Sequence, residues 1–200
     1  PDVVFEMPNA YEVPPTGTVE YTYIVIPTGF TKDTWITAAE VRPGDRSVVH
    51  HVIASVRPPG SPYLRNVKPG VPFVPVTHER DANGAAIRRN VQASSADLQR
   101  ASQAADGAAV VATEFLVGYA PGLQEQRYDL AVPGAGKMIP AGSDIILQMH
   151  YTTSGKAASD KTKIGLTMAK EQPKYRYLTL SAAATRLEIP ANEAHYESNA

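Results

Sequence analysis

The sequence predicts an all-β protein, an antiparallel β-sandwich of the jelly-roll kind, on three observations. Short runs rich in β-branched and aromatic residues recur along the chain, turns containing Pro and Gly separate them, and at most one segment has a helical pattern. Roughly six or seven such strands are expected, as in sandwich domains. With 43% hydrophobic residues, a chain of 200 residues can bury a substantial core as one domain.

The expected elements begin with an arm. Residues 2–15 contain three prolines and no sustained periodicity, so they are expected to lie extended over a surface. Apolar or alternating runs bounded by turns then predict the strands, at residues 18–27, 35–41, 47–56, 110–119, 143–153, 163–169 and 175–180. Four tyrosines in or next to these runs are expected to pack within the sheets: Tyr21, Tyr23, Tyr175 and Tyr177.

Residues 58–113 are predicted to be a long irregular insertion in a domain that spans residues 1–186. Six prolines occupy its first third, and residues 81–84 are typical of a turn. Residues 94–104 offer a serine N-cap and good helix formers but little to bury, so they form either one short helix or a solvated segment. Residues 187–200 are interpreted as a linker or the start of a second, absent domain.

Composition and charge exclude several classes of function. The formal net charge is -1, and Lys and Arg are scattered, so neither nucleic-acid binding nor a polybasic membrane patch is indicated. The chain has no cysteine, which excludes disulfides, thiolate ligands and a cysteine nucleophile. No apolar run reaches the roughly 20 residues of a spanning helix, so no membrane insertion is expected.

The strand at residues 47–56 carries two adjacent histidines, His50 and His51, in an apolar and β-branched run. Side chains alternate along a regular strand, so the two imidazole rings would point to opposite faces of the sheet. If both rings serve one site, the backbone has to bend there, through a bulge or at the end of the strand.

A second strand, at residues 143–153, carries His150. Alternation places Ile145, Leu147, Met149 and Tyr151 on one continuous apolar face, and it places His150 on the other. His150 is therefore expected off the main core face. Met149 is expected in the core and not as a ligand.

Five segments together resemble the N-terminal domain of the copper type II, ascorbate-dependent monooxygenases, the family of dopamine beta-monooxygenase and peptidylglycine alpha-hydroxylating monooxygenase, and the bacterial relatives in particular. They occur in the same order: EVRPG at 40–44, VVHHV at 48–52, GYAPG at 118–122, IPAGS at 139–143 and LQMHY at 147–151. The resemblance covers most of residues 1–190, without residues 58–113. In this family the paired histidines and the later histidine hold one electron-storing copper.

The resemblance implies that His50, His51 and His150 are the ligands of one copper ion per chain, with ascorbate as the reductant. It also implies a second copper domain downstream, because the family's oxygen-activating copper uses two His and a Met in a motif that this chain lacks. The chain alone is therefore expected to cycle copper between Cu(II) and Cu(I) without hydroxylating a substrate. A periplasmic or extracellular location is implied as well. Disulfides that the family's animal members use in this domain cannot form here.

Other interpretations remain open from the residues. Three histidines and a water are also a catalytic zinc arrangement. The chain could instead be a non-catalytic copper-binding or copper-buffering module, or a jelly-roll ligand-binding domain with incidental histidines. His78, in an expected loop, and His195, near the C-terminus, are interpreted as solvated. Tyr151 is expected to pack, with a supporting role next to the ligands as the alternative.

Overall fold

Two facing β-sheets build the domain in a computed structural model, which describes residues 1–74, 76–80, 86–90, 113–180, 192, 195 and 197. For residues 76–80 and 86–90 the description is limited to the backbone. The described residues contain fourteen strands and no helix, so none of them forms a helix able to cross a membrane. The predicted all-β class is confirmed. The jelly-roll connections stay a prediction.

The larger sheet has the strand order β1-β13-β4-β10-β14, and β9 also pairs with β4. Its pairs are antiparallel except for β10 with β14, which is parallel. In chain order these strands are β1 (Val3–Glu6), β4 (Thr34–Arg42), β9 (Gln126–Arg127), β10 (Ala135–Ile139), β13 (Lys163–Met168) and β14 (Tyr175–Arg176).

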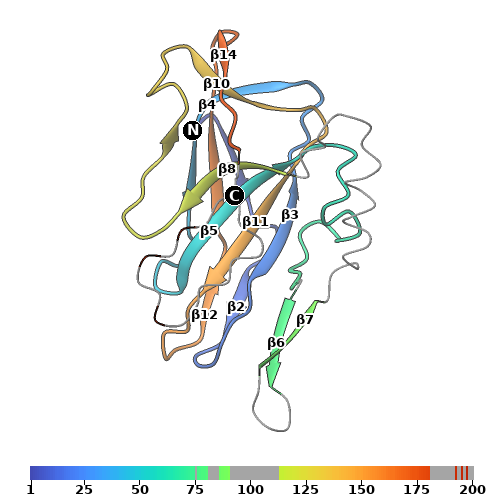
Figure 1. The fold of residues 1–200 in the computed structure, drawn as a ribbon, viewed down its shortest axis with the longest axis vertical. Coiled ribbons are helices and arrows are strands. Elements are labelled where there is room, and N and C mark those ends of the chain that lie inside the picture. The colour runs from blue at the N-terminus through green and yellow to red at the C-terminus, as the bar shows by residue number, and fades with distance from the viewer. Residues whose placement is uncertain are drawn as a thin grey trace.

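The smaller sheet has the order β3-β11-β5-β8 and is antiparallel throughout. Its strands are β3 (Thr22–Pro27), β5 (Val49–Arg57), β8 (Glu114–Tyr119) and β11 (Asp144–Tyr151). Two short ladders complete the fold, β2 (Tyr11–Val13) with β12 (Ala158–Asp160) and β6 (Val76–Arg80) with β7 (Ala86–Asn90). Figure 1 shows β3, β11 and β5 side by side in one layer.

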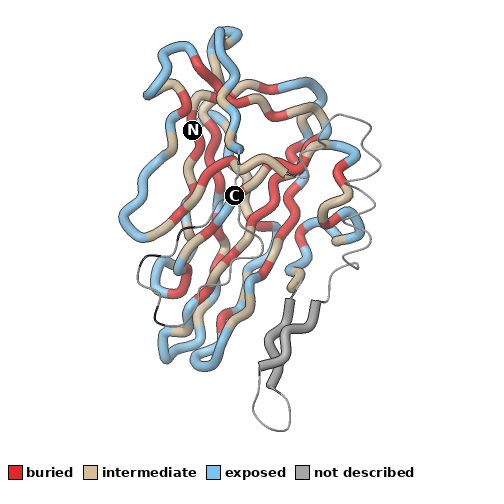
Figure 2. Tube along the Cα trace, viewed as in Figure 1, coloured by how far each residue is buried: buried red, intermediate tan, exposed pale blue. Residues whose placement is uncertain are grey.

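The core lies between the two sheets, where alternate side chains of both meet. On β11, Ile145, Leu147, Met149 and Tyr151 are buried, as the apolar pattern of this strand predicts. They join Ile36 and Leu166 from the larger sheet in one hydrophobic cluster. Figure 2 shows the buried positions running along the strands of both layers. The other side chains of these strands therefore lie on the outer face of the smaller sheet.

All seven predicted strands are found, most of them with shorter bounds and β4 with slightly longer ones, but the sequence underestimates the number of strands. Residues 2–15 are extended in part, as expected, but they are not an arm laid over a surface, because β1 and β2 pair with β13 and β12. Strands β9, β10 and β12 were not expected, since each is short or lacks alternation and depends on a partner distant in sequence. The strand expected at 175–180 is reduced to β14, and Tyr175 is exposed instead of packed.

The insertion at 58–113 is less irregular than expected, since it contains the β6–β7 hairpin. The expected helix at 94–104 and the expected turn at 81–84 lie outside the described residues. Residues before the hairpin cover part of the outer face of the smaller sheet. There Leu64 packs with Val25 and Ile146, together with Tyr23, Tyr63, Val67 and Phe73.

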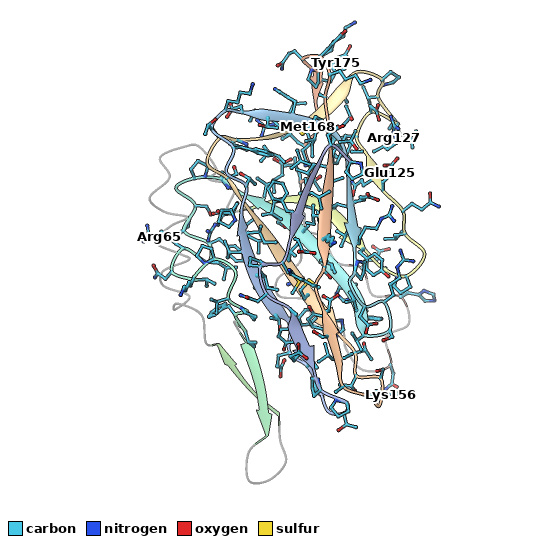
Figure 3. The ribbon with its side chains drawn as sticks, turned by 180° about the vertical axis from the view of Figure 1, so that it is seen from behind. Arg65, Glu125, Arg127, Lys156, Met168 and Tyr175 are labelled. Carbon is cyan, nitrogen blue, oxygen red and sulfur yellow. The ribbon has the colours of Figure 1, made fainter. Side chains whose placement is uncertain are left out.

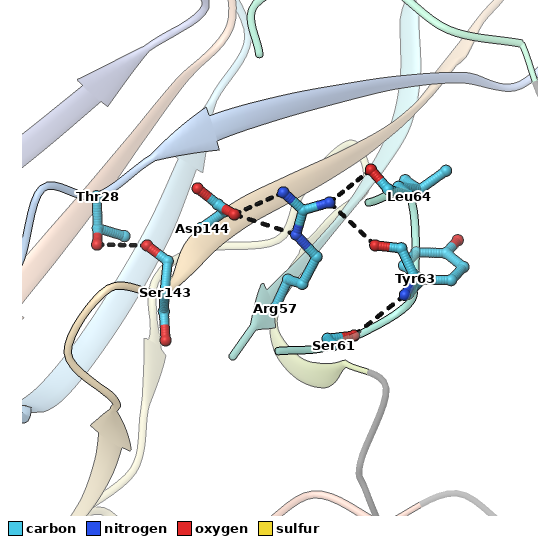
Figure 4. A network of polar contacts seen from close by, with 7 residues as sticks. All are labelled: Thr28, Arg57, Ser61, Tyr63, Leu64, Ser143 and Asp144. Carbon is cyan, nitrogen blue, oxygen red and sulfur yellow. Dashed lines mark hydrogen bonds and ion pairs between the residues drawn. The ribbon is translucent and has the colours of Figure 1, made fainter. Parts of the chain in front are cut away.

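Arg57, at the end of β5, ties this covering segment to the sheet, as Figure 4 shows. Its guanidinium donates to Asp144 Oδ2 at 2.6 and 3.1 Å and to the carbonyl oxygens of Tyr63 and Leu64 at 3.0 and 2.6 Å. Leu64 has a φ of 52°, a conformation that a branched residue adopts only at a cost of about 1 kcal/mol or more. The hydrogen bond from Arg57 and the burial of Leu64 offset this strain.

Replacing Arg57 by methionine should therefore destabilise the fold by about 2 kcal/mol. The change keeps the apolar stem but removes the donor of the Tyr63 carbonyl and of the half-buried Asp144 carboxylate, while the Leu64 carbonyl keeps only the N–H of Val67. Urea denaturation would measure the loss. The matched control is Arg42→Met, which breaks the exposed pair with Glu40 and should leave the unfolding midpoint unchanged. Equal midpoints for the two variants would contradict this role of Arg57.

Candidate metal centre

The pairing of β5 with β11 is irregular at the two adjacent histidines. His51 lies opposite His150 and Val49 lies opposite Tyr151, so His50 is an extra residue on β5 without a partner in the ladder. Such a β-bulge puts two residues of one strand opposite one residue of its neighbour. The burial pattern of β5 agrees with this bulge: Val49 and Val52 are buried, whereas His50 and His51 between them both face outward. The predicted departure from regular pairing is confirmed.

The bulge brings three ring nitrogens together on the outer face of the smaller sheet. The Nδ1 atoms of His50, His51 and His150 lie 3.2 Å apart in each of the three pairs. Among the described residues, these three form the group that can hold a metal ion. The structure thus brings together all three histidines that the sequence singles out.

The size of this triangle suits a metal ion. A metal–imidazole bond is about 2.0–2.1 Å long. The corners of an equilateral triangle with sides of 3.2 Å lie about 1.8 Å from its centre, so one ion close to that centre can reach all three nitrogens. Three donors converge among the residues that the structure describes, and these leave a further coordination position of the ion to a water or another ligand.

Hydrogen bonding alone cannot satisfy this triangle. A neutral imidazole Nδ1 is either a donor or an acceptor, and a protonated ring makes it a donor. Around three mutually contacting nitrogens these roles cannot alternate, so at least one of the 3.2 Å contacts joins two donors or two acceptors. A cation that accepts all three lone pairs removes the conflict. The arrangement of the three nitrogens therefore favours a bound metal ion at these residues.

The surroundings favour the neutral form of two of the three rings, His51 and His150. Partial burial, followed by the neighbouring His150 and His50, lowers the pKa of His51 below the ordinary histidine value. Partial burial and His50 lower the pKa of His150 in the same direction. Neutral imidazole is the metal-binding form. Protons therefore compete less strongly with a metal here than at a free histidine.

Tyr21 belongs to this site, although the sequence suggested only strand packing. Its ring stacks on His150 with centroids 4.6 Å apart and lies 5.8 Å from the ring of His51, and 40% of the residue is exposed. The signal was the register of the sheet: Thr22 pairs with Met149, which places Tyr21 next to His150. Tyr21 therefore covers one side of the imidazole cluster.

The other histidines are elsewhere. His195 is exposed and is not part of the group. His78 was expected in a loop, which is wrong, because it lies on β6 opposite Arg88. Met149 and Tyr151 are buried, as expected.

A shallow open cleft lies at the other end of the molecule, lined by Arg127, Met168 and Lys174 among others. Figure 3 labels Arg127 and Met168 near one end, and Lys156, which follows the end of β11, at the other. Arg127 is paired with Asp129 in this cleft. None of the three clustered histidines lines this cleft, so it is not part of the candidate metal centre.

No known family model matches the chain, and no curated protein is matched by its sequence.

Proposed function

We propose that this chain is a copper-binding, electron-storing domain of a copper monooxygenase that uses ascorbate as reductant and hydroxylates its substrate with O2. The observation that carries the proposal is the convergence of three Nδ1 atoms at 3.2 Å on an outward face. The five sequence segments that resemble the copper type II monooxygenases support it, because the three histidines in those segments are the ones that converge.

The donor set favours copper chemistry. Imidazole suits copper in both of its common oxidation states, and the group contains no carboxylate or thiolate. Copper would supply one-electron transfer at this position. Zinc fits three histidines and a water as well, but it has no redox chemistry, so a redox measurement separates the two metals.

The chain's own residues have three tasks at such a site. The bulge on β5 holds His50 and His51 on the same side of the sheet, facing His150. The lowered pKa of His51 and of His150 favours the neutral imidazole, the form that binds a metal. Tyr21 covers one side of the rings and limits the approach of solvent from there. Together these features fix the ligands before a metal arrives.

The oxygen-activating copper and the substrate are proposed to belong to a second domain downstream of the residues described, as in the resembled family. A periplasmic or extracellular location is part of the same proposal. A copper-buffering module is the rival function, since it would use the same three ligands. Reduction by ascorbate distinguishes them, because buffering does not require rapid and reversible electron transfer.

The chain loaded with one equivalent of Cu(II) should give an axial electron paramagnetic resonance spectrum that ascorbate abolishes and air restores over repeated cycles. The chain loaded with zinc is the silent control. A stoichiometry far from one copper per chain, as measured by metal analysis of the purified protein, would contradict the ligand assignment. A copper signal that ascorbate leaves unchanged would favour the buffering module.

A further inference from the structure

A buried aspartate on the core side of the sheet accepts four hydrogen bonds, two of them from residues close in sequence to the candidate ligands. Asp160 is fully buried at the end of β12. Its Oδ1 accepts from the backbone N–H groups of Gly44 and Asp45 at 2.8 and 3.0 Å. Its Oδ2 accepts from the hydroxyls of Tyr151 and Thr162 at 3.0 and 2.8 Å. A buried carboxylate with all of its partners in place is a rigid point in a fold.

The partners of Asp160 lie on the two chain segments that carry the ligands. Tyr151 directly follows His150 on β11. Asp45 begins the turn into β5, and its carbonyl accepts from Val49 N at 3.2 Å, one residue before His50. The first bond beyond the bulge, from Thr152 N to Val48 O at 2.8 Å, closes the same region. Asp160 therefore connects both segments on the core side of the bulge.

Close packing restricts the loop that enters β5. A Cβ atom built on Gly44 would lie 2.6 Å from Lys161 N and 3.1 Å from Asp160 Oδ1. Only glycine allows the loop to approach the Asp160–Lys161 backbone this closely. The ring of Tyr151 is held as well, because it stacks on Tyr11 with centroids 4.7 Å apart and an angle of 3° between the planes.

We propose that Asp160 is a positioning residue for the histidine cluster. Its hydrogen bonds to Tyr151 and to the loop at Gly44 and Asp45 hold in place the two chain segments that carry the ligands. The proposal rests on the proposed function. A β-bulge can shift along its strand unless contacts specify its position, and a shift of one residue would send a ligand to the core face. By fixing the residues on both sides of the bulge, Asp160 keeps His50, His51 and His150 on one face.

The test compares two chemically identical changes. Tyr151→Phe removes the hydroxyl that donates to Asp160, and Tyr128→Phe removes an equally buried hydroxyl that donates to Leu116 O at 2.8 Å, away from the cluster. Both variants keep their aromatic rings, so their melting temperatures should decrease by similar amounts. Only Tyr151→Phe should weaken Cu(II) binding, by about tenfold, the lower end of the effect of losing an outer-shell partner. Its copper hyperfine splitting should also differ from that of the unmodified chain.

A second variant keeps the test decisive. In Asp160→Asn the amide oxygen can still accept from Gly44 and Asp45, and the two hydroxyls can turn to accept from the amide nitrogen. We expect it to bind copper better than Asp160→Ala. Unchanged affinity and spectrum in Tyr151→Phe, or equal weakening in Tyr128→Phe, would overturn the positioning role while leaving the copper site intact. A failure of the unmodified chain to bind copper would overturn the proposed function, and with it this inference.

Discussion

Replacing His150 or His51 by alanine is expected to lower the affinity for Cu(II) by more than about 100-fold, beyond the usual effect of losing an outer-shell partner. Each variant removes one corner of the Nδ1 triangle and leaves two donors, of which His50 lies on the exposed side. Competition with a chromophoric chelator measures the affinity. The fold should survive, because the rings lie outside the core cluster.

The control for these variants is His78→Ala, which removes a histidine on β6, outside the cluster. It should bind copper like the unmodified chain. Retention of copper by His150→Ala to the same extent as by His78→Ala would eliminate the three-histidine assignment. Loss of copper in all variants, with a collapsed circular dichroism spectrum, would instead show that the variants are unfolded.

Replacing Glu114 by alanine is expected to destabilise the fold by about 3–5 kcal/mol, because it leaves a buried ammonium without its partner. Lys137 on β10 is 0% exposed, and its Nζ is paired with the carboxylate of Glu114 on β8. Its other neighbours are Thr179 Oγ1 at 3.4 Å and the rings of Tyr128 and Tyr177, with centroids at 5.7 and 5.5 Å. Burial already lowers the pKa of Lys137, and the bond to Glu114 opposes that shift.

Lys137→Met should cost much less than Glu114→Ala, since methionine suits the apolar site and Glu114 keeps Arg176 at 3.6 Å and some access to water. Thermal denaturation measures both. At about 2–4 °C per kcal/mol for a chain of this size, Glu114→Ala should lower the melting temperature by roughly 6–20 °C. Breaking the exposed pair between Lys163 and Glu6 with Glu6→Gln should have no measurable effect. Equal losses for Glu114→Ala and Lys137→Met would contradict the asymmetry.

The sequence predicted those strands whose own pattern of apolar and polar residues identifies the buried face. On β11 the alternation of Ile145, Leu147 and Met149 identifies the core face without any knowledge of the neighbours. The sequence of β10 does not identify its buried face, because a lysine such as Lys137 is expected at the surface. Its burial becomes understandable only once Glu114 is known to pair with it. Burial of a charge depends on a partner, and the partner here comes from another sheet.

The site was predicted to a similar extent. The residue types of His50, His51 and His150 indicated a metal, and the alternation of a strand required a bulge, which the structure has. Tyr21 and Asp160 were not found, because their relation to the cluster depends on strand register and on a hydrogen-bond network between distant segments. Side-chain chemistry can be read from the sequence, whereas such supporting contacts appear only once the strands are paired.

Because His50 is an extra residue on β5, the formation of this site also depends on the number of residues in that strand. Without that one residue, His51 opposite His150 and Val49 opposite Tyr151 would be consecutive pairs of an uninterrupted ladder. A deletion of a single codon, which leaves every core residue in place, is thus sufficient to separate a chain with three converging imidazoles from one with two. When related chains are aligned, a gap at this position is as informative about metal binding as a substituted histidine.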